Sequence, residues 1–301
     1  MTKNRRFTPF YPSKTKHFSM IAIDKRKSLL ETLNKLRAEG KKVGFVPTMG
    51  ALHEGHIFLV RQAREQNDIV VTSIFVNPTQ FNNKNDLLHY PRTLEADSKM
   101  LEKAGCDFLF VPEVKEMYPD GVEEKVPPID LAGLDTVMEG AHRPGHFAGV
   151  IQVVKKLFDS VGPCKAYFGE KDFQQLAVIR RMVQEWKMPV EIIPCPIVRE
   201  EDGLAMSSRN MRLTADERKI APAISKALFA AKEKWMQSSV AEIKEMVTAK
   251  INTEPMLKLE YFEISDATTL QPVKEDQKKN VVACIAVHLG AVRLIDNVIL
   301  G

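Results

Sequence analysis

Two histidines lie three residues apart in a glycine-containing segment, Pro47-Thr-Met-Gly-Ala-Leu-His53-Glu-Gly-His56, directly after a short apolar run. Residues at this spacing project on the same side of a first helical turn, so both imidazoles are expected to face one ligand. A helix N-terminus offers free N–H groups and positive potential to a phosphate, and Gly50 and Gly55 let the backbone approach closely. The pattern predicts a phosphate site; two solvent-facing histidines without a role are the alternative.

A second polar group, Gly169-Glu-Lys171-Asp172-Phe-Gln-Gln175, follows another apolar run. Lys171 offers a mobile cation for phosphates, and Asp172 can cap the next helix or face a ribose hydroxyl or a metal ion. The alternative is that Asp172 only caps the helix and Lys171 is only a surface charge.

Three further segments carry polar side chains. Residues 206–210 supply two serines and an arginine that can bind a triphosphate from the opposite side of a cleft, although this composition is ordinary for a loop. Asn77 and Gln80 follow a strongly β-branched run and can hydrogen-bond a polar uncharged or carboxylate substrate. Arg143 and His146 lie beside proline and glycine, and they can reach an anion or belong only to an exposed basic turn.

Strands and helices must bring these segments together, and their pattern alternates up to about residue 198. Strands are expected at 43–47, 69–76, 107–111, 164–168 and 190–198, and helices at 25–39, 54–66, 93–104, 147–161 and 172–186. Such alternation indicates right-handed βαβ units and a parallel sheet. Ligands of such sheets bind beyond the C-terminal ends of the strands, where the histidine segment is expected.

The pattern changes after residue 198. Helical patterns at 215–237 and 240–251 precede strand-like runs at 259–265, 281–287 and 292–295, which indicates a small α+β domain. The predicted class is α/β: a Rossmann-like doubly wound parallel-sheet N-terminal domain with a smaller α+β C-terminal domain. The expected division is a basic, disordered extension at 1–19, a nucleotide- and substrate-binding domain at 20–197, and a C-terminal lid domain at 198–301.

The 301 residues suit two domains, and 44% hydrophobic with 27% charged residues excludes a mainly disordered, collagenous or membrane-spanning chain. The net charge is +4, but residues 1–19 carry five basic and no acidic residues, so the rest of the chain has 4 − 5 = −1. A nearly neutral body argues against nucleic-acid binding. A nucleic-acid-binding module that uses the tail is the alternative of a different class.

Four cysteines without a CxxC spacing predict neither a zinc site nor a redox dithiol, and they fit reduced thiols in a cytoplasmic protein. No apolar stretch reaches 18 residues, so no membrane span is expected. The tail lacks the apolar core of a secretory signal. It loosely fits an organellar transit peptide; a disordered extension, or a misassigned start upstream of Met20, are the alternatives.

The polar segments together resemble the pantothenate synthetase (pantoate–β-alanine ligase) family of the HxGH nucleotidyltransferase superfamily. The strings PTMGALHEGH, SIFVNPTQF, EGAHRPGHF, FGEKDFQQL and MSSRN are each close to the family's own, and the resemblance runs from about Met20 to Asn297. HxGH alone is shared by a wider group, so the combination is the specific signal. Arg212 stands where the family usually has tyrosine, so the local packing is expected to differ there while the chemistry does not. The family normally lacks residues like 1–19.

The resemblance implies ATP-dependent condensation of (R)-pantoate with β-alanine, through pantoyl adenylate, to pantothenate, AMP and diphosphate. It implies that His56 is the acid/base and phosphate-stabilising residue, with His53, Lys171 and Arg209 beside it in catalysis. It also implies Mg²⁺ that bridges the phosphates without a protein cage, and a homodimer. No nucleic acid or membrane is expected as a partner. An adenylyltransferase that stops at an adenylylated product is the close alternative.

The resemblance also assigns contacts to the substrates. Gln80 and Gln175 would hold pantoate, Gln80 would also lie near β-alanine, and Asn77 joins them as the hydrogen-bonding residue expected above. Val198 would contact adenine through its backbone. The remaining ATP contacts are implied for Met49, Gly50, Ala51, Leu52, His53, Glu54, Gly55, His56, Gly169, Glu170, Lys171, Asp172, Met206, Ser207, Ser208 and Arg209.

Deletion of residues 1–19 is expected to leave turnover unchanged within about twofold, because terminal extensions seldom contribute to a buried site. Steady-state kinetics of the full-length and shortened chains provides the comparison. A large loss of turnover on deletion would show that the tail takes part in the reaction.

Overall fold

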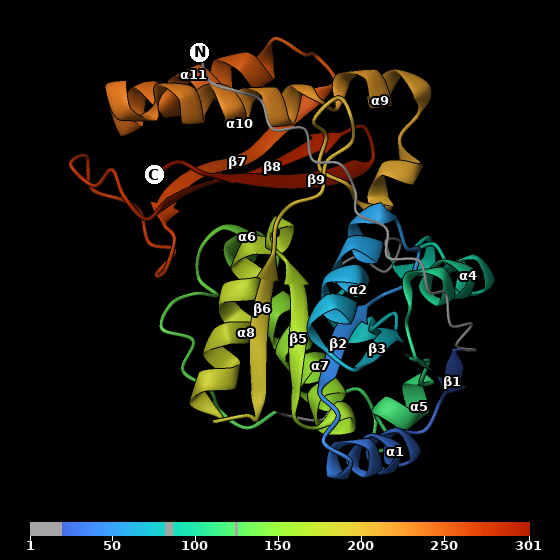
Figure 1. Ribbon diagram of the computed structural model, residues 1–301. Coiled ribbons are helices and arrows are strands. Elements are labelled where there is room, and N and C mark those ends of the chain that lie inside the picture. Colours follow the sequence, from blue (N-terminus) through green and yellow to red (C-terminus); the bar gives the residue numbers. More distant parts are fainter. Residues whose placement is uncertain (1–19, 82–86, 124–125) are drawn as a thin grey trace, which may run out of the picture.

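The computed structural model describes residues 20–81, 87–123 and 126–301 (Figure 1). The predicted extension 1–19 therefore lies outside the described residues. Among those that are described, six parallel strands form one sheet and three antiparallel strands form another. The Rossmann-like doubly wound sheet and the smaller α+β part are confirmed. The domain boundary near residue 197 stays a prediction.

The parallel sheet reverses its strand order in the middle. Its order is β1-β4-β3-β2-β5-β6, so the chain moves outward from β2 through β3 to β4 and then returns to the other side of β2. The point of reversal lies between β2 and β5, where open α/β sheets bind ligands. The strands are β1 (Ile21–Ile23), β2 (Val43–Thr48), β3 (Ile69–Ile74), β4 (Phe108–Phe110), β5 (Cys164–Gly169) and β6 (Val190–Cys195).

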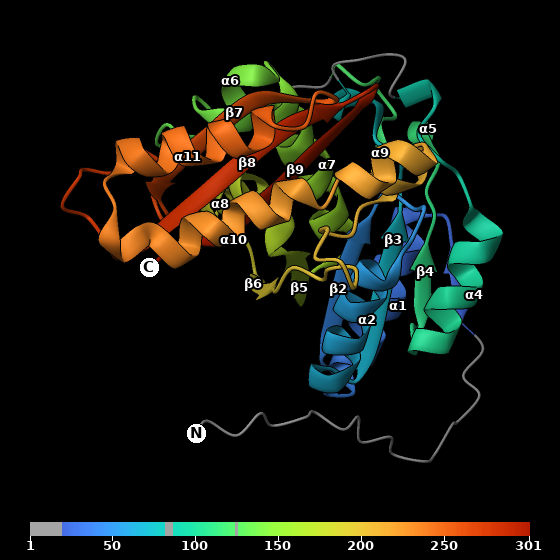
Figure 2. The same cartoon turned by 90° about the horizontal axis from the view of Figure 1, so that it is seen from above.

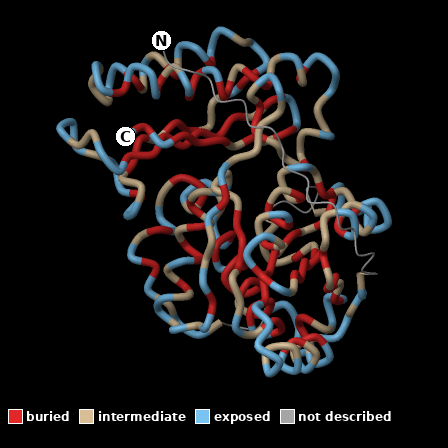
Figure 3. The backbone as a smooth tube through the Cα atoms, in the orientation of Figure 1, coloured by how far each residue is buried: buried red, intermediate tan, exposed pale blue. Residues whose placement is uncertain are grey.

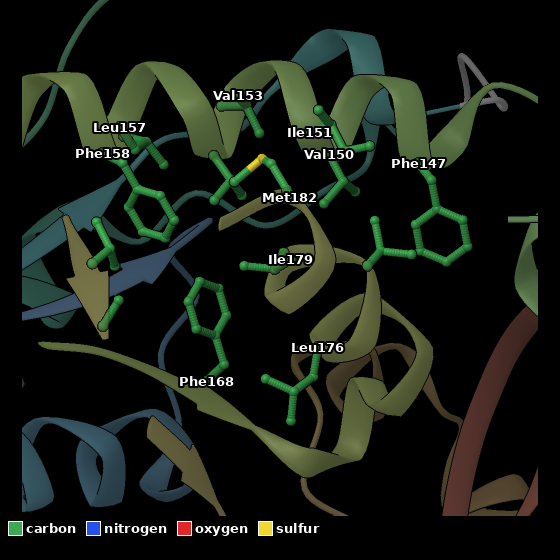
Figure 4. Close-up of a cluster of buried hydrophobic side chains, with 14 of the residues drawn as sticks. Phe147, Val150, Ile151, Val153, Leu157, Phe158, Phe168, Leu176, Ile179 and Met182 are labelled. Carbon is green, nitrogen blue, oxygen red and sulfur yellow. The ribbon is translucent and has the colours of Figure 1, made fainter. Parts of the chain in front are cut away.

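Helices cover both faces of this sheet, because alternate strand residues point to opposite sides. Phe45 packs in the core under one set of helices, and its neighbour Val46 packs under the other. Figure 4 shows the first core, where Phe158 and Phe168 meet edge to face at 6.3 Å between ring centroids. One face carries α2 (Glu54–Gln66) and α4 (Leu94–Ala104); the other carries α1 (Arg26–Ala38), α7 (His146–Val161) and α8 (Phe173–Glu185).

The antiparallel sheet lies between two helices and the parallel-sheet body (Figures 1 and 2). Its Phe262 and Ile264 pack under α10 and α11, whereas Tyr261 and Cys284 join the core of the body. Figure 3 shows much of these strands as buried, and β8 almost throughout. The elements are α9 (Ala215–Ile220), α10 (Ala223–Lys234), α11 (Val240–Asn252), β7 (Leu257–Asp266), β8 (Val281–Leu289) and β9 (Val292–Ile299).

Several predicted bounds were wrong, and proline explains two of them. The helix expected at 215–237 is divided, because Pro222 between α9 and α10 lacks the N–H that a continuous helix needs. The strand expected at 190–198 ends at Cys195, directly before Pro196, which has no N–H to donate to a neighbouring strand. The sequence did not predict β1, α5 (Val114–Met117) or α6 (Met138–His142).

The segment 259–265 and the two strand-like runs after it extend further than expected, to the bounds of β7, β8 and β9. Within the described residues, no helix is both long and apolar enough to span a bilayer.

Candidate active site

A pocket opens beyond the C-terminal ends of β2 and β5, at the reversal of the strand order. Its walls come from segments far apart in sequence. The histidine segment forms one wall and the turn after β5 forms another. Residues 196–198 and 206–209 also line the pocket, and α7 supplies an apolar wall. Gln80 also lines the pocket, so the structure brings four of the predicted polar segments to one place.

His53 and His56 hold each other and the start of α2. His53 is the N-cap, and its Nδ1 accepts from the backbone N–H of Gly55 at 3.1 Å. The backbone N–H of His53 donates to Nδ1 of His56 at 3.4 Å, and the two ring centroids are 4.1 Å apart. Because each Nδ1 accepts a hydrogen bond, we assign the proton of each neutral ring to Nε2. Both histidines can then donate from Nε2 to a ligand.

Burial keeps both rings neutral. It lowers the pKa of His53 to about 4, and the nearby charge of Lys171 acts in the same direction while Asp172 opposes it. Burial likewise lowers the pKa of His56 to about 3, with His53 and then Lys171 adding to the effect. The pair is therefore uncharged at pH 7, and the positive charge beside it comes from Lys171.

A buried carboxylate that the sequence did not reveal shapes the histidine segment. Asp97 on α4 is 1% exposed, and its two oxygens accept the backbone N–H groups of Ala51 and Leu52, each at 2.9 Å. Gly50 and Ala51 both have a positive φ, 81° and 51°, a backbone conformation that residues other than glycine rarely adopt. Asp97 thus holds an unusual turn. In the sequence it is one more acid of an amphipathic helix, so no local pattern marks it.

The serine segment closes on the histidine segment by a direct hydrogen bond. Ser208 Oγ donates to the carbonyl of Ala51 at 2.9 Å, across 157 residues of sequence. Ser207 caps the short 3₁₀ turn Ser208–Arg212 by accepting from the N–H of Arg209 at 3.2 Å. The backbone N–H of Met206 donates to the carbonyl of Val198 at 3.0 Å, so these two predicted ATP contacts are neighbours.

The segment after β3 approaches α7 closely. A Cβ on Gly149 would lie 2.4 Å from the carbonyl oxygen of Thr79, so only glycine fits there. Asn77 is fully buried, donating to the carbonyl of Gly149 at 3.2 Å and accepting from the hydroxyl of Tyr118 at 2.8 Å. Asn77 therefore fixes the turn that presents Gln80, and it lies behind the pocket wall.

Arg143 and His146 lie next to this turn. His146 Nδ1 is 2.9 Å from the carbonyl oxygen of Gln80, so its ring carries the proton on Nδ1, and burial followed by the charge of Arg143 lowers its pKa to about 4. Both residues line a smaller recess that also contains Lys171, Asp172 and Gln175.

Most of the predicted site residues line the main pocket. Gly50, Ala51, Leu52, Glu54, Glu170 and Asn77 are the predicted residues that lie off its wall. The wall contains Met49, His53, Gly55, His56, Gln80, Gly169, Lys171, Asp172, Gln175, Val198, Met206, Ser207, Ser208 and Arg209.

Comparison with known proteins decides the family. The model of the pantoate-beta-alanine ligase family matches residues 21–299. The chain belongs to the pantoate–β-alanine ligase family. It is 56% identical over 273 residues to the pantothenate synthetase of Bacteroides fragilis, covering 90% of this chain and 96% of that protein. It is 53% identical over 272 residues to that of Porphyromonas gingivalis, with the same coverage of both chains.

Solved structures of pantoate–β-alanine ligases share the fold. The pantothenate synthetase of Thermus thermophilus has a TM-score of 0.87 at 44% identity, covering 93% of this chain and 99% of that one. The pantoate-beta-alanine ligase of Francisella tularensis, complexed with beta-gamma ATP and beta-alanine, has a TM-score of 0.76 at 37% identity. Here the coverage is 94% of this chain and 98% of the other.

The depressed pKa values of the histidine pair predict a distinctive pH response. Both imidazoles should stay neutral with the proton on Nε2 down to about pH 5, and ¹⁵N NMR of the rings measures this. Since the unfolded histidines titrate near pH 6.5, their contribution to stability is present above pH 6.5 and is lost as the pH falls toward 4 for His53 and toward 3 for His56.

Lys171→Ala should raise the titration midpoints of both His53 and His56, because a neighbouring positive charge is removed. Midpoints near 6.5 in the wild type would contradict the burial of the pair.

Proposed function

We propose that this pocket catalyses the ATP-dependent condensation of (R)-pantoate with β-alanine, giving pantothenate, AMP and diphosphate. The observation that carries the proposal is that one pocket gathers the histidine pair, Lys171 and Arg209 with the two glutamines expected to hold pantoate, Gln80 and Gln175. Membership of the pantoate–β-alanine ligase family and the ATP and β-alanine of the Francisella structure support it.

In the first half-reaction a pantoate carboxylate oxygen attacks the α-phosphorus of ATP, and the bond from that phosphorus to diphosphate breaks. A carboxylate needs no deprotonation at neutral pH, so the step requires alignment and neutralisation of charge. Nε2–H groups of His53 and His56 donate to phosphate oxygens, and Lys171 and Arg209 supply positive charge. A pKa of about 3 favours His56 as a hydrogen-bond donor and not as a proton source.

In the second half-reaction the amine of β-alanine attacks the acyl carbon of pantoyl adenylate, and AMP leaves. Gln80 and Gln175 present amide groups to the polar atoms of pantoate, and Phe75, Val150 and Val154 give the same pocket an apolar wall for its two methyl groups. Gln80 is already oriented, since its Nε2 lies 2.8 Å from Sδ of Met49.

Pantoyl adenylate hydrolyses readily, so the intermediate needs protection from water. We propose that the C-terminal part, 198–301, acts as a lid together with the segment around Arg143. The hydrogen bond from Ser208 to the carbonyl of Ala51 supports this, because it joins the serine segment directly to the histidine segment.

We further propose that Mg²⁺ binds together with ATP. We also propose that the protein is a homodimer and is cytoplasmic. Among the described residues, no cluster of three or more potential ligands could form a metal cage. Asp172 is the one carboxylate of the described chain that lines the main pocket. One carboxylate with phosphate oxygens is the arrangement that Mg²⁺ favours. Asp172 would hold the ion, which would neutralise phosphate charge.

The function is tested by an assay in which ATP, pantoate and β-alanine are omitted in turn. We expect pantothenate and AMP only with all three, and diphosphate release that requires pantoate but not β-alanine. An enzyme that stopped at an adenylylated product would release diphosphate and form no pantothenate. Diphosphate release that strictly required β-alanine would contradict the adenylate route.

His56→Ala is expected to lower kcat by at least about 100-fold, because a donor placed at developing charge contributes a factor of this size. Steady-state turnover is the measurement. The control is Arg61→Ala, an exposed residue of the same helix, which should retain wild-type turnover. Unchanged turnover in His56→Ala would remove the histidine from the mechanism.

A further inference from the structure

A buried amide of the C-terminal sheet binds the backbone of the Lys171 turn. Asn297 on β9 is 4% exposed, and its Nδ2 donates to the carbonyl oxygens of Glu170 and Lys171, each at 2.9 Å. These are consecutive residues of the 3₁₀ turn Glu170–Asp172 that follows β5. Both N–H bonds of one amide are therefore used on the backbone that carries Lys171.

The neighbouring residue holds the backbone of Asn297 in place. Asp296 is also 4% exposed and forms two hydrogen bonds with the guanidinium of Arg199, at 2.7 and 2.9 Å. Asp296 also accepts the backbone N–H of Asn297 at 2.8 Å, and Arg199 donates to the carbonyl of Asn297 at 3.2 Å. Both the backbone N–H and the backbone carbonyl of Asn297 are therefore hydrogen-bonded, which fixes the residue whose side chain binds the turn.

The ion pair of Asp296 and Arg199 also connects β9 to the segment that contains the serines. Arg199 follows Val198 and forms a β-bridge with Ala205, directly before the serine segment. Through Arg199 and Asn297, β9 therefore contacts both segments that flank the expected nucleotide. No hydrogen bond or ion pair of Lys171 Nζ is found within the described chain, so the place of its turn sets the region that this mobile charge can reach.

We propose that Asn297 is a positioning residue for ATP: it fixes the Lys171 turn against the C-terminal sheet and so sets the place of the Lys171 charge. This inference rests on the proposed function of Lys171 in binding phosphate. Loss of the amide N–H groups removes this donor from two partly buried carbonyls, and the turn is then free to shift away from β9. Asn297 itself need not touch the nucleotide.

A double-mutant cycle tests whether Asn297 acts through Lys171. The four proteins are the wild type, Asn297→Leu, Lys171→Ala and the double variant, and kcat/KM for ATP in pantothenate formation is measured for each. We expect Asn297→Leu to lower this value at least about tenfold when Lys171 is present, since a small displacement costs this much. In the Lys171→Ala background the loss should be under about twofold, because residues that act through one group are not additive.

Equal losses in both backgrounds would overturn the proposal, since Asn297 would then act on folding or on another group. The matched control is Trp235→Phe, which removes a buried indole hydrogen bond to Lys278 elsewhere in the C-terminal part and should change kcat/KM less than about twofold. Thermal unfolding is followed for every variant. If Asn297→Leu does not fold, the smaller Asn297→Ser replaces it in the same cycle.

The affinity for ATP, measured by calorimetry, gives a second cycle that does not need turnover. Wild-type activity in Lys171→Ala would contradict the role of Lys171 and with it this proposal. If the wild type formed no pantothenate, the proposed function would fail, and the cycle in ATP affinity would still decide whether Asn297 and Lys171 are coupled.

Discussion

Two adjacent parallel strands, β2 and β5, send the chain to opposite faces of the sheet, and the site depends on this constraint. The helix after β2 packs in the core on one face, and the helix after β5 packs in the core on the other. The loops between strand and helix must therefore separate, which leaves a crevice at the ends of the two strands. The histidine segment and the Lys171 turn are the two sides of that crevice.

Buried polar contacts from distant elements then fix each side. Asp97 accepts two backbone N–H groups of the histidine segment, and Asn297 donates to two carbonyls of the Lys171 turn. A buried polar group without a partner is costly, so each of these contacts favours one loop conformation strongly. Ser208 adds a bond between the serine and histidine segments. The pocket is thus shaped before any ligand enters.

The expected phosphate site combines neutral hydrogen-bond donors with positively charged side chains. The histidine pair is neutral because it is buried, and the orientation of both rings follows from backbone N–H groups that occupy Nδ1. Positive charge comes from side chains with longer reach, such as Lys171. A triphosphate can then accept hydrogen bonds from neutral imidazoles, whose desolvation costs less free energy than that of a charged group, and it can pair with cations next to them.

Periodicity and short motifs were enough to predict the alternating strands and helices, and the segments at the ends of β2 and β5. These features are local: side-chain alternation, β-branched runs and glycine turns act over a few residues. The prediction failed where a few residues carry no such signal, as at β1 and α6, and where Pro222 divides an otherwise continuous helical pattern. Asp97 and Asn297 were missed as contributors to the site for a related reason, since their partners lie 45 and 126 residues away along the chain.

The sequence alone determined which residue types stand at each strand end, and with them the family and the chemistry expected of it. Only the tertiary structure decided how those residues are presented. It neutralised the histidines by burial, moved Asn77 from the pocket wall to its support, and joined β9 to the Lys171 turn. Burial and long-range hydrogen bonds arise from chain segments that meet only on folding, so no local pattern could contain them.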